Sequence, residues 1–157
     1  MSKFTLLAAV LLLSQVVPPS VNPLLFGSWT LNLAKSVYEL GPPPKSQTWK
    51  YEPFGDGMRV AVETISGNGA RIAYGYAVKL DGREYPIEGE RTPNGADTIS
   101  VLSVDALTTD ATLRRGGEIV LKIRSVLSRD GKVLTLTSKG TNLNELPTNS
   151  VTVFGRQ

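Results

Sequence analysis

Short turn sequences rich in glycine recur along the chain after residue 26 and divide it into brief segments of strand-forming residues. Pairs such as Asp81-Gly82 and Asp130-Gly131 favour tight chain reversals, because glycine and aspartate tolerate the positive φ angles of hairpin turns. No window of about a dozen residues between these turns has the apolar period of a helix. The pattern predicts an all-β chain of about ten antiparallel strands, near residues 26–32, 46–53, 58–65, 70–79, 83–88, 97–104, 107–114, 118–127, 132–139 and 149–156.

The predicted strands alternate apolar and polar residues, so each strand has one face suited to a protein interior. Met58, Val60 and Val62, for example, share one face of their strand, whereas Arg59 and Glu63 lie on the other. One face of the whole series is therefore expected to be apolar. The same alternation predicts that further side chains point inward, namely Trp49, Tyr51, Ile72, Tyr74, Tyr76, Val78, Ile119, Leu121, Ile123, Leu127, Leu134 and Leu136.

A meander with one apolar face can close on itself or stack as two sheets. Closure removes the exposed sheet edges, and hairpins joined in sequence order are typical of an up-and-down barrel. We therefore expect residues 24–157 to form one domain, an antiparallel meander barrel of about 8–10 strands, with a β-sandwich as the alternative. The proline-rich residues 41–44 impose an extended passage, so residues 34–45 are expected to form a long crossing or lid-like connection.

The first twenty residues have the features of a secretory signal peptide. Lys3 precedes an apolar run from Phe4 to Val17, which ends at Pro18 and Pro19. This run is shorter than the roughly 20 apolar residues that a membrane-spanning helix needs. We expect residues 1–20 to be removed on export, leaving a periplasmic or secreted protein without stable membrane insertion. An uncleaved N-terminal anchor is the alternative, because no pair of small residues marks the cleavage site.

The chain contains no histidine and no cysteine. Their absence excludes serine–histidine and cysteine–histidine catalysis, conventional zinc sites and histidine-ligated haem. Glu84, Glu88 and Glu90 would share one face of an extended strand, where a solvated position is the expected one. We therefore predict no catalytic residues, no metal site, no cofactor and a protein that is not an enzyme.

The charge of the chain is close to balanced, with 17 Lys and Arg against 14 Asp and Glu. A phosphate-binding surface needs clustered basic residues. The only adjacent basic pair, Arg114-Arg115, precedes a Gly-Gly turn and is expected to be a solvated hairpin end. Nucleic acid is therefore not expected as a partner.

Four aromatic residues fall on the inward faces of two predicted strands: Trp49, Tyr51, Tyr74 and Tyr76. Such residues can line an apolar pocket while their polar atoms orient a ligand. They can also simply fill the core, because small barrels are often packed solid by their own side chains. Trp49, Tyr51, Tyr74 and Tyr76 are our candidates for a ligand-binding site.

The first predicted strand begins with Gly27-Ser28-Trp29, and a Gly-x-Trp sequence at this place resembles the N-terminal signature of lipocalins. More of the chain resembles the small exported bacterial lipocalin-like proteins, within the lipocalin and fatty-acid-binding barrel superfamily. The matching sequences are residues 29–36 (WTLNLAKS), 41–45 (GPPPK), 51–53 (YEP), 81–86 (DGREYP), 130–135 (DGKVLT) and 138–141 (SKGT). The chain differs from true lipocalins because it has no cysteine pair and no predicted helix after the last strand. Its number of predicted strands, about ten rather than eight, is closer to that of the fatty-acid-binding branch.

The resemblance implies a barrel that binds small apolar molecules. It also implies a structural role in barrel closure for Gly27, Trp29 and Arg156, because an arginine near the end of lipocalin barrels packs on the tryptophan of the Gly-x-Trp sequence. Arg156, on the last predicted strand, is the candidate for this arginine.

Three functions are compatible with these features. The first is an exported barrel that holds a small hydrophobic molecule by burial, without chemistry. The second is a cell-envelope interaction module with a solidly packed interior, whose stiff residues 41–45 contact a partner. The third is an enzyme with a carboxylate-based site, which no convergent set of residues supports. The identity of a ligand and the oligomeric state are not encoded in any motif of the chain.

Overall fold

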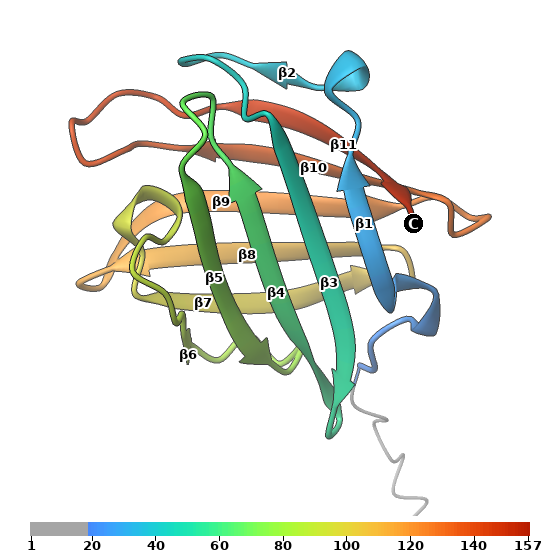
Figure 1. Ribbon diagram of the computed structural model, residues 1–157. Helices are drawn as coiled ribbons and strands as arrows, with labels where there is room; N and C mark the ends of the chain where they lie inside the picture. Colours follow the sequence, from blue (N-terminus) through green and yellow to red (C-terminus); the bar gives the residue numbers. More distant parts are fainter. Residues whose placement is uncertain (1–18) are drawn as a thin grey trace, which may run out of the picture.

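Eleven strands form a single antiparallel sheet that curls around one interior (Figure 1). The structure, a computed structural model, describes residues 19–157, so the expected signal peptide lies almost entirely outside the described residues. The strands are β1 (Gly27–Leu31), β2 (Val37–Tyr38), β3 (Ser46–Phe54), β4 (Gly57–Ile65), β5 (Arg71–Val78), β6 (Tyr85–Pro86), β7 (Thr98–Asp105), β8 (Thr108–Arg115), β9 (Glu118–Leu127), β10 (Val133–Gly140) and β11 (Ser150–Arg156).

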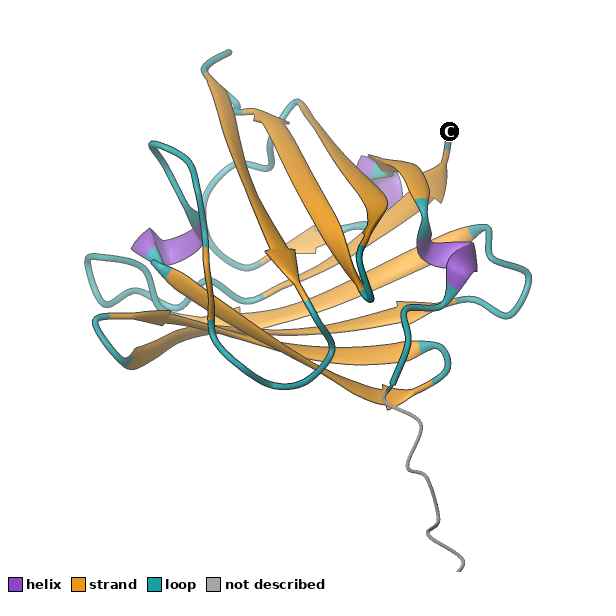
Figure 2. Ribbon diagram, turned by 90° about the horizontal axis from the view of Figure 1, so that it is seen from below, coloured by secondary structure: helices purple, strands orange, loops and turns teal. Residues whose placement is uncertain are grey.

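Three short 3₁₀ helices lie in the connections, as Figure 2 shows from below the barrel. They are η1 (Pro23–Leu25), η2 (Leu33–Lys35) and η3 (Pro93–Gly95). Within residues 19–157, no helix is long and apolar enough to cross a membrane.

The sheet follows the order β5-β4-β3-β1-β11-β10-β9-β8-β7-β6, with β2 added beside β11. The first and last long strands therefore pair, β1 with β11, as closure of a meander requires. At the remaining gap, Gly75 of β5 and Glu88 exchange two backbone hydrogen bonds of 2.9 and 2.8 Å. The prediction of an up-and-down meander barrel is confirmed, and the β-sandwich alternative is wrong.

The inward faces of the strands form one continuous core. Figure 1 shows β3, β4 and β5 crossing in front of β7, β8, β9 and β10, so two curved walls face each other across the interior. Trp29, Val60 and Phe154 are fully buried in this core. Met58, Val62, Val78, Leu121, Ile123, Leu127, Leu134 and Leu136 are also buried, as their alternation predicts.

The prediction that Ile119 points inward is wrong, because its side chain is 50% exposed. In the pairing of β8 with β9, Arg114 lies opposite Ile119 but Leu113 lies opposite Leu121, so Val120 is an extra residue. Such a β-bulge breaks the alternation of side chains. Val120 and Leu121 are consequently both buried, although they are neighbours in the sequence.

The segment predicted as a strand over residues 83–88 has only two residues of ladder, Tyr85 and Pro86. The carboxylate of Asp81 accepts hydrogen bonds from the Arg83 backbone N–H (3.0 Å) and from the Tyr85 hydroxyl (2.8 Å), and these bonds hold the preceding residues in a turn. This short segment completes the barrel between β5 and β7.

The long connection after β1 contains structure that the sequence did not predict. It begins with η2 and continues as β2, whose Val37 and Tyr38 pair with Val151 and Ser150 of β11. A strand of two residues has no detectable alternation, which explains why it was missed. Gly41 then lies in a bend with a φ angle of +74°, and residues 42–44 after it belong to no helix or strand.

Candidate ligand-binding site

A large cavity of about 910 Å³ opens at one end of the barrel. Its rim is formed by the β2–β3 connection, the β4–β5 turn, the residues around η3 and the β10–β11 loop. Its inner wall includes the side chains of Trp49, Tyr74, Ile123, Leu136 and Thr152. The opening is therefore built from loops, whereas the wall is built from strands, which position side chains rigidly.

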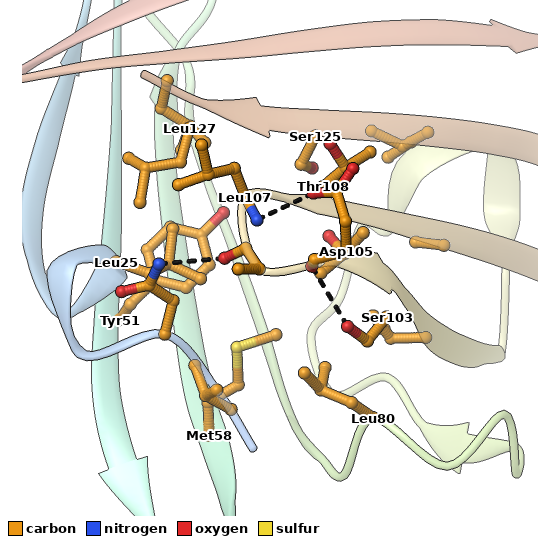
Figure 3. A pocket seen from close by; sticks show the side chains of 18 of the residues that line it. Leu25, Tyr51, Met58, Leu80, Ser103, Asp105, Leu107, Thr108, Ser125 and Leu127 are labelled. Carbon is orange, nitrogen blue, oxygen red and sulfur yellow. Dashed lines mark hydrogen bonds between the residues drawn. The ribbon is translucent and has the colours of Figure 1, made fainter. Parts of the chain in front are cut away.

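The smaller cavity, of about 50 Å³, lies at the opposite end of the barrel. Figure 3 shows Tyr51 and Leu25 on one side of it and Thr108, Ser125 and Ser103 on the other. A volume of this size holds a few water molecules or one end of a larger molecule. The two cavities share Trp49 and Ile123 in their walls.

The N-terminal segment covers the end of the barrel beside the smaller cavity. Val21 is 8% exposed and belongs to the core. Asn22 donates a hydrogen bond from Nδ2 to the Ala106 carbonyl (2.9 Å) in the β7–β8 turn, and its Oδ1 accepts from the Leu24 N–H (3.0 Å) at the start of η1. The residues just before η1, together with η1 itself, thereby cover this end of the barrel.

The structure divides the four aromatic candidates between the two cavities. Tyr51 and Tyr76 line the smaller cavity, Tyr74 lines the larger one, and Trp49 lines both. The Trp49 ring stacks on Tyr51 at a centroid distance of 6.0 Å and meets Tyr74 edge-on at 6.4 Å. Trp49, Tyr51 and Tyr74 therefore form one aromatic cluster between the cavities.

Trp49 is fixed in place by its polar atom. Its Nε1 donates to Gln47 Oε1 (3.0 Å), and Gln47 Nε2 donates to Thr64 Oγ1 (2.8 Å). Gln47 and Thr64 both line the larger cavity. Because the indole N–H is satisfied within the protein, Trp49 offers a ligand its apolar ring.

The three tyrosines differ from Trp49 because their hydroxyl groups have no hydrogen-bond partner within residues 19–157. Burial raises the pKa of Tyr51, Tyr74 and Tyr76 above the ordinary phenol value of 10.0. All three phenols are therefore neutral at physiological pH. They remain able to donate a hydrogen bond.

Inward hydroxyl residues on the opposite wall were missed in the sequence. Ser103, Thr109 and Ser125 occupy inward positions of β7, β8 and β9 and line the smaller cavity. Thr109 lies two residues before the inward Ala111, and Ser125 two residues after the inward Ile123, so the alternation contained the signal. These small side chains leave the space that the smaller cavity occupies.

The residues expected to close the barrel lie together at the junction of β1 and β11. Trp29 pairs with Arg156 across the two strands, and the guanidinium carbon lies 4.4 Å from the centroid of the Trp29 ring. Arg156 also donates hydrogen bonds to the carbonyls of Gly131 (3.0 Å), Phe26 (2.8 Å) and Leu24. One side chain thus connects the last strand, the segment before β1 and the β9–β10 turn.

Gly27 is required beside this arginine for two reasons. Its φ angle is +127°, a conformation that other residues rarely adopt. A Cβ atom at this position would lie 2.8 Å from Arg156 Nη1. The Gly-x-Trp sequence therefore combines a tryptophan with the space that its covering arginine needs.

The acidic residues of the described chain are dispersed over its surface and rim. Within residues 19–157, no group of three or more Asp or Glu side chains could hold a metal ion. Glu84 accepts a hydrogen bond from Thr98 (2.8 Å) on the exposed outside of the barrel, while Glu90 and Arg91 lie at the rim of the larger cavity.

These features define an up-and-down β-barrel with a hollow, aromatic-lined interior that opens at one end. No protein-family model matches the chain, and no curated protein matches it. Among solved structures, the chain is similar to the zebrafish ileal bile acid-binding protein crystallised with cholic acid, with 13% sequence identity and a TM-score of 0.49. That match covers 85% of this chain and 99% of the other.

Proposed function

We propose that this protein binds a small hydrophobic molecule inside the barrel and acts by burial, without covalent chemistry. The open cavity of about 910 Å³ carries the proposal. Its volume lies at the upper end of the roughly 300–1,000 Å³ range typical of small-molecule pockets. An interaction module with a solidly packed interior does not account for a cavity of this size.

The chemistry of the wall supports the same function. The Trp49 ring and the side chains of Ile123 and Leu136 provide an apolar surface deep in the cavity, while Thr64 and Ser138 provide dispersed polar atoms. Apolar surface with a few fixed polar groups is the usual composition of a small-molecule site. Apolar burial supplies most of the binding free energy in such a site.

Titration of Trp49 fluorescence with palmitate and with farnesol tests this function. We expect a saturable change in emission for at least one of the two. The matched control is Trp49→Phe, in which the remaining Trp29 is fully buried outside both cavities and should not respond. Unchanged emission in the natural protein, together with native mass spectra of gently purified protein that contain no bound lipid, would contradict the proposal.

We also propose that the protein is exported, with residues 1–20 as its signal peptide and a periplasmic or secreted location. The charged and apolar pattern of Lys3 and residues 4–17 supports this proposal. The burial of Val21 in the core supports a mature chain that keeps this residue. N-terminal sequencing of the protein from its source cells should find a start near Val21, whereas an intact Met1 in an intracellular fraction would exclude processing.

A further inference from the structure

The hydroxyls of Tyr51, Tyr74 and Tyr76 form a group of unused hydrogen-bond donors in the barrel interior. Tyr51 and Tyr76 both lie opposite Val60 in the sheet, one on each side of it, so their side chains share a row across β3, β4 and β5. Tyr74 occupies the next inward row with Trp49, both opposite Val62. The three phenols therefore lie in adjacent positions on one wall.

These hydroxyls have no hydrogen-bond partner within residues 19–157, and the three side chains line cavities that water or a ligand can enter. Tyr51 is only 4% exposed, and its hydroxyl makes no hydrogen bond within the part of the chain that the structure describes. Buried polar groups are almost always hydrogen-bonded in native proteins, because an unpaired one costs free energy. A ligand that fills the cavities displaces water from these groups, so a ligand with an acceptor avoids the cost of leaving them unpaired.

The charges around the smaller cavity select against an anionic group. Within residues 19–157, no Lys or Arg side chain lines this cavity, and the one carboxylate in its lining belongs to Asp105. The Leu107 backbone N–H donates to this carboxylate (2.8 Å) and lowers the pKa of Asp105, which is therefore charged at neutral pH. A ligand carboxylate placed here would meet a like charge and no cation.

We infer that the ligand carries a neutral hydrogen-bond acceptor, such as a ketone, ester or quinone oxygen, which accepts hydrogen bonds from Tyr51 and Tyr76 in the smaller cavity. This inference rests on the proposed function. The apolar body of the ligand occupies the larger cavity, and its acceptor end passes Trp49 and Ile123, the two residues that both cavities share. Tyr74, in the larger cavity next to Trp49, is a third donor along this path.

Three probes with the same ring system test the inference. They are 6-propionyl-2-dimethylaminonaphthalene, which has a ketone, the corresponding 6-carboxylate, and 6-propyl-2-dimethylaminonaphthalene, in which a CH₂ group replaces the carbonyl acceptor. We expect the ketone to bind about fivefold to 25-fold more tightly than the acceptor-free compound, from one or two hydrogen bonds. The carboxylate should bind most weakly. Equal affinity of the ketone and the acceptor-free compound, or tighter binding of the carboxylate, would overturn the inference.

Tyr51→Phe and Tyr76→Phe locate the donors. Each should weaken ketone binding about fivefold, leave the affinity for the acceptor-free compound unchanged and shift the emission of the bound ketone to shorter wavelength. Tyr85→Phe is the matched control, because the Tyr85 hydroxyl donates to Asp81 and the residue lines neither cavity. All three variants keep the aromatic ring, and thermal melting checks that they fold.

The result separates this inference from the proposed function. If the acceptor-free compound binds as well as the ketone and the two Tyr→Phe changes have no effect, the hydrogen-bond subsite is wrong while hydrophobic burial stands. If none of the three probes binds, the inference fails. The palmitate and farnesol titrations then decide the proposed function independently.

Discussion

Arg156 contributes to stability through an aromatic contact and three carbonyl partners. A cation–π contact at an exposed site contributes about 0.5–1 kcal/mol, and hydrogen bonds from a charged group add to it. Because the side chain remains solvent-accessible, we expect Arg156→Ala to lower the free energy of unfolding by about 1–3 kcal/mol. Arg156→Lys should restore less than half of this loss, since one ammonium group cannot reach all of these carbonyls. Urea denaturation in a Trp49→Phe background, followed by Trp29 fluorescence, measures the stability of both Arg156 variants. An unchanged urea midpoint and Trp29 emission spectrum for Arg156→Ala would show that Arg156 does not stabilise the barrel.

Gly27 and Gly155 provide a matched pair for testing the space beside that arginine. Gly155 lies on the neighbouring strand, and a Cβ atom there would meet no atom within 4 Å. Gly27→Ala should cost about 1–3 kcal/mol, because it forces a strained backbone angle and displaces Arg156. Gly155→Ala should change stability by less than about 0.5 kcal/mol. Thermal melting of the two variants compares their stabilities. Equal losses of stability would show that the close approach of Arg156 to Gly27 does not matter for folding.

At the scale of elements, the N-terminal segment holds the lower end of the barrel through Asn22. Asn22→Ala removes both the cap of η1 and the bond to the Ala106 carbonyl, and should lower the free energy of unfolding by about 1–2 kcal/mol. Asn22→Asp keeps the acceptor for the Leu24 N–H but has no group to donate to Ala106. Hydrogen exchange of the Leu107 and Leu24 amides should therefore separate the two contacts. If Asn22→Asp and Asn22→Ala accelerate hydrogen exchange equally at Leu24 and at Leu107, the two hydrogen bonds do not act independently.

The elements also show how far the sequence predicts this molecule. The boundaries of the long strands follow from the turn glycines, as at the β9–β10 turn, where Asp130-Gly131 separates strands predicted at 118–127 and 132–139 and found at Glu118–Leu127 and Val133–Gly140. Ile119 was misplaced because a bulge depends on the register with β8, which is a tertiary property. The four aromatic candidates follow from alternation alone. Their division between two cavities depends on which loops and which opposing side chains leave space, and no local pattern contains that information.

At the scale of the whole molecule, the barrel has two unlike ends. Long loops surround the open cavity at one end, whereas η1 and the short β7–β8 turn cover the other. The aromatic cluster lies between them, and Trp49 also meets Phe154 of β11 edge-on at 6.1 Å. A ligand of the proposed kind that enters from the open end would therefore meet Tyr74 and Trp49 before it reaches Tyr51 and Tyr76.

The buried tyrosines should make the whole barrel sensitive to alkaline pH. Their pKa values are raised by burial in the folded state, whereas in the unfolded chain they are close to 10.0. Above pH 10 the unfolded chain therefore binds fewer protons than the folded protein, and its free energy falls relative to the folded state. The free energy of unfolding should accordingly be constant with respect to these groups below pH 10 and decrease above it, by up to about 1.4 kcal/mol per pH unit for each tyrosine that stays protonated. Urea midpoints between pH 8 and pH 11.5 measure this slope, and the combined change of Tyr51, Tyr74 and Tyr76 to Phe should flatten it. Parallel curves for the natural protein and the triple variant would show that the three phenols ionise as easily in the folded barrel as in the unfolded chain.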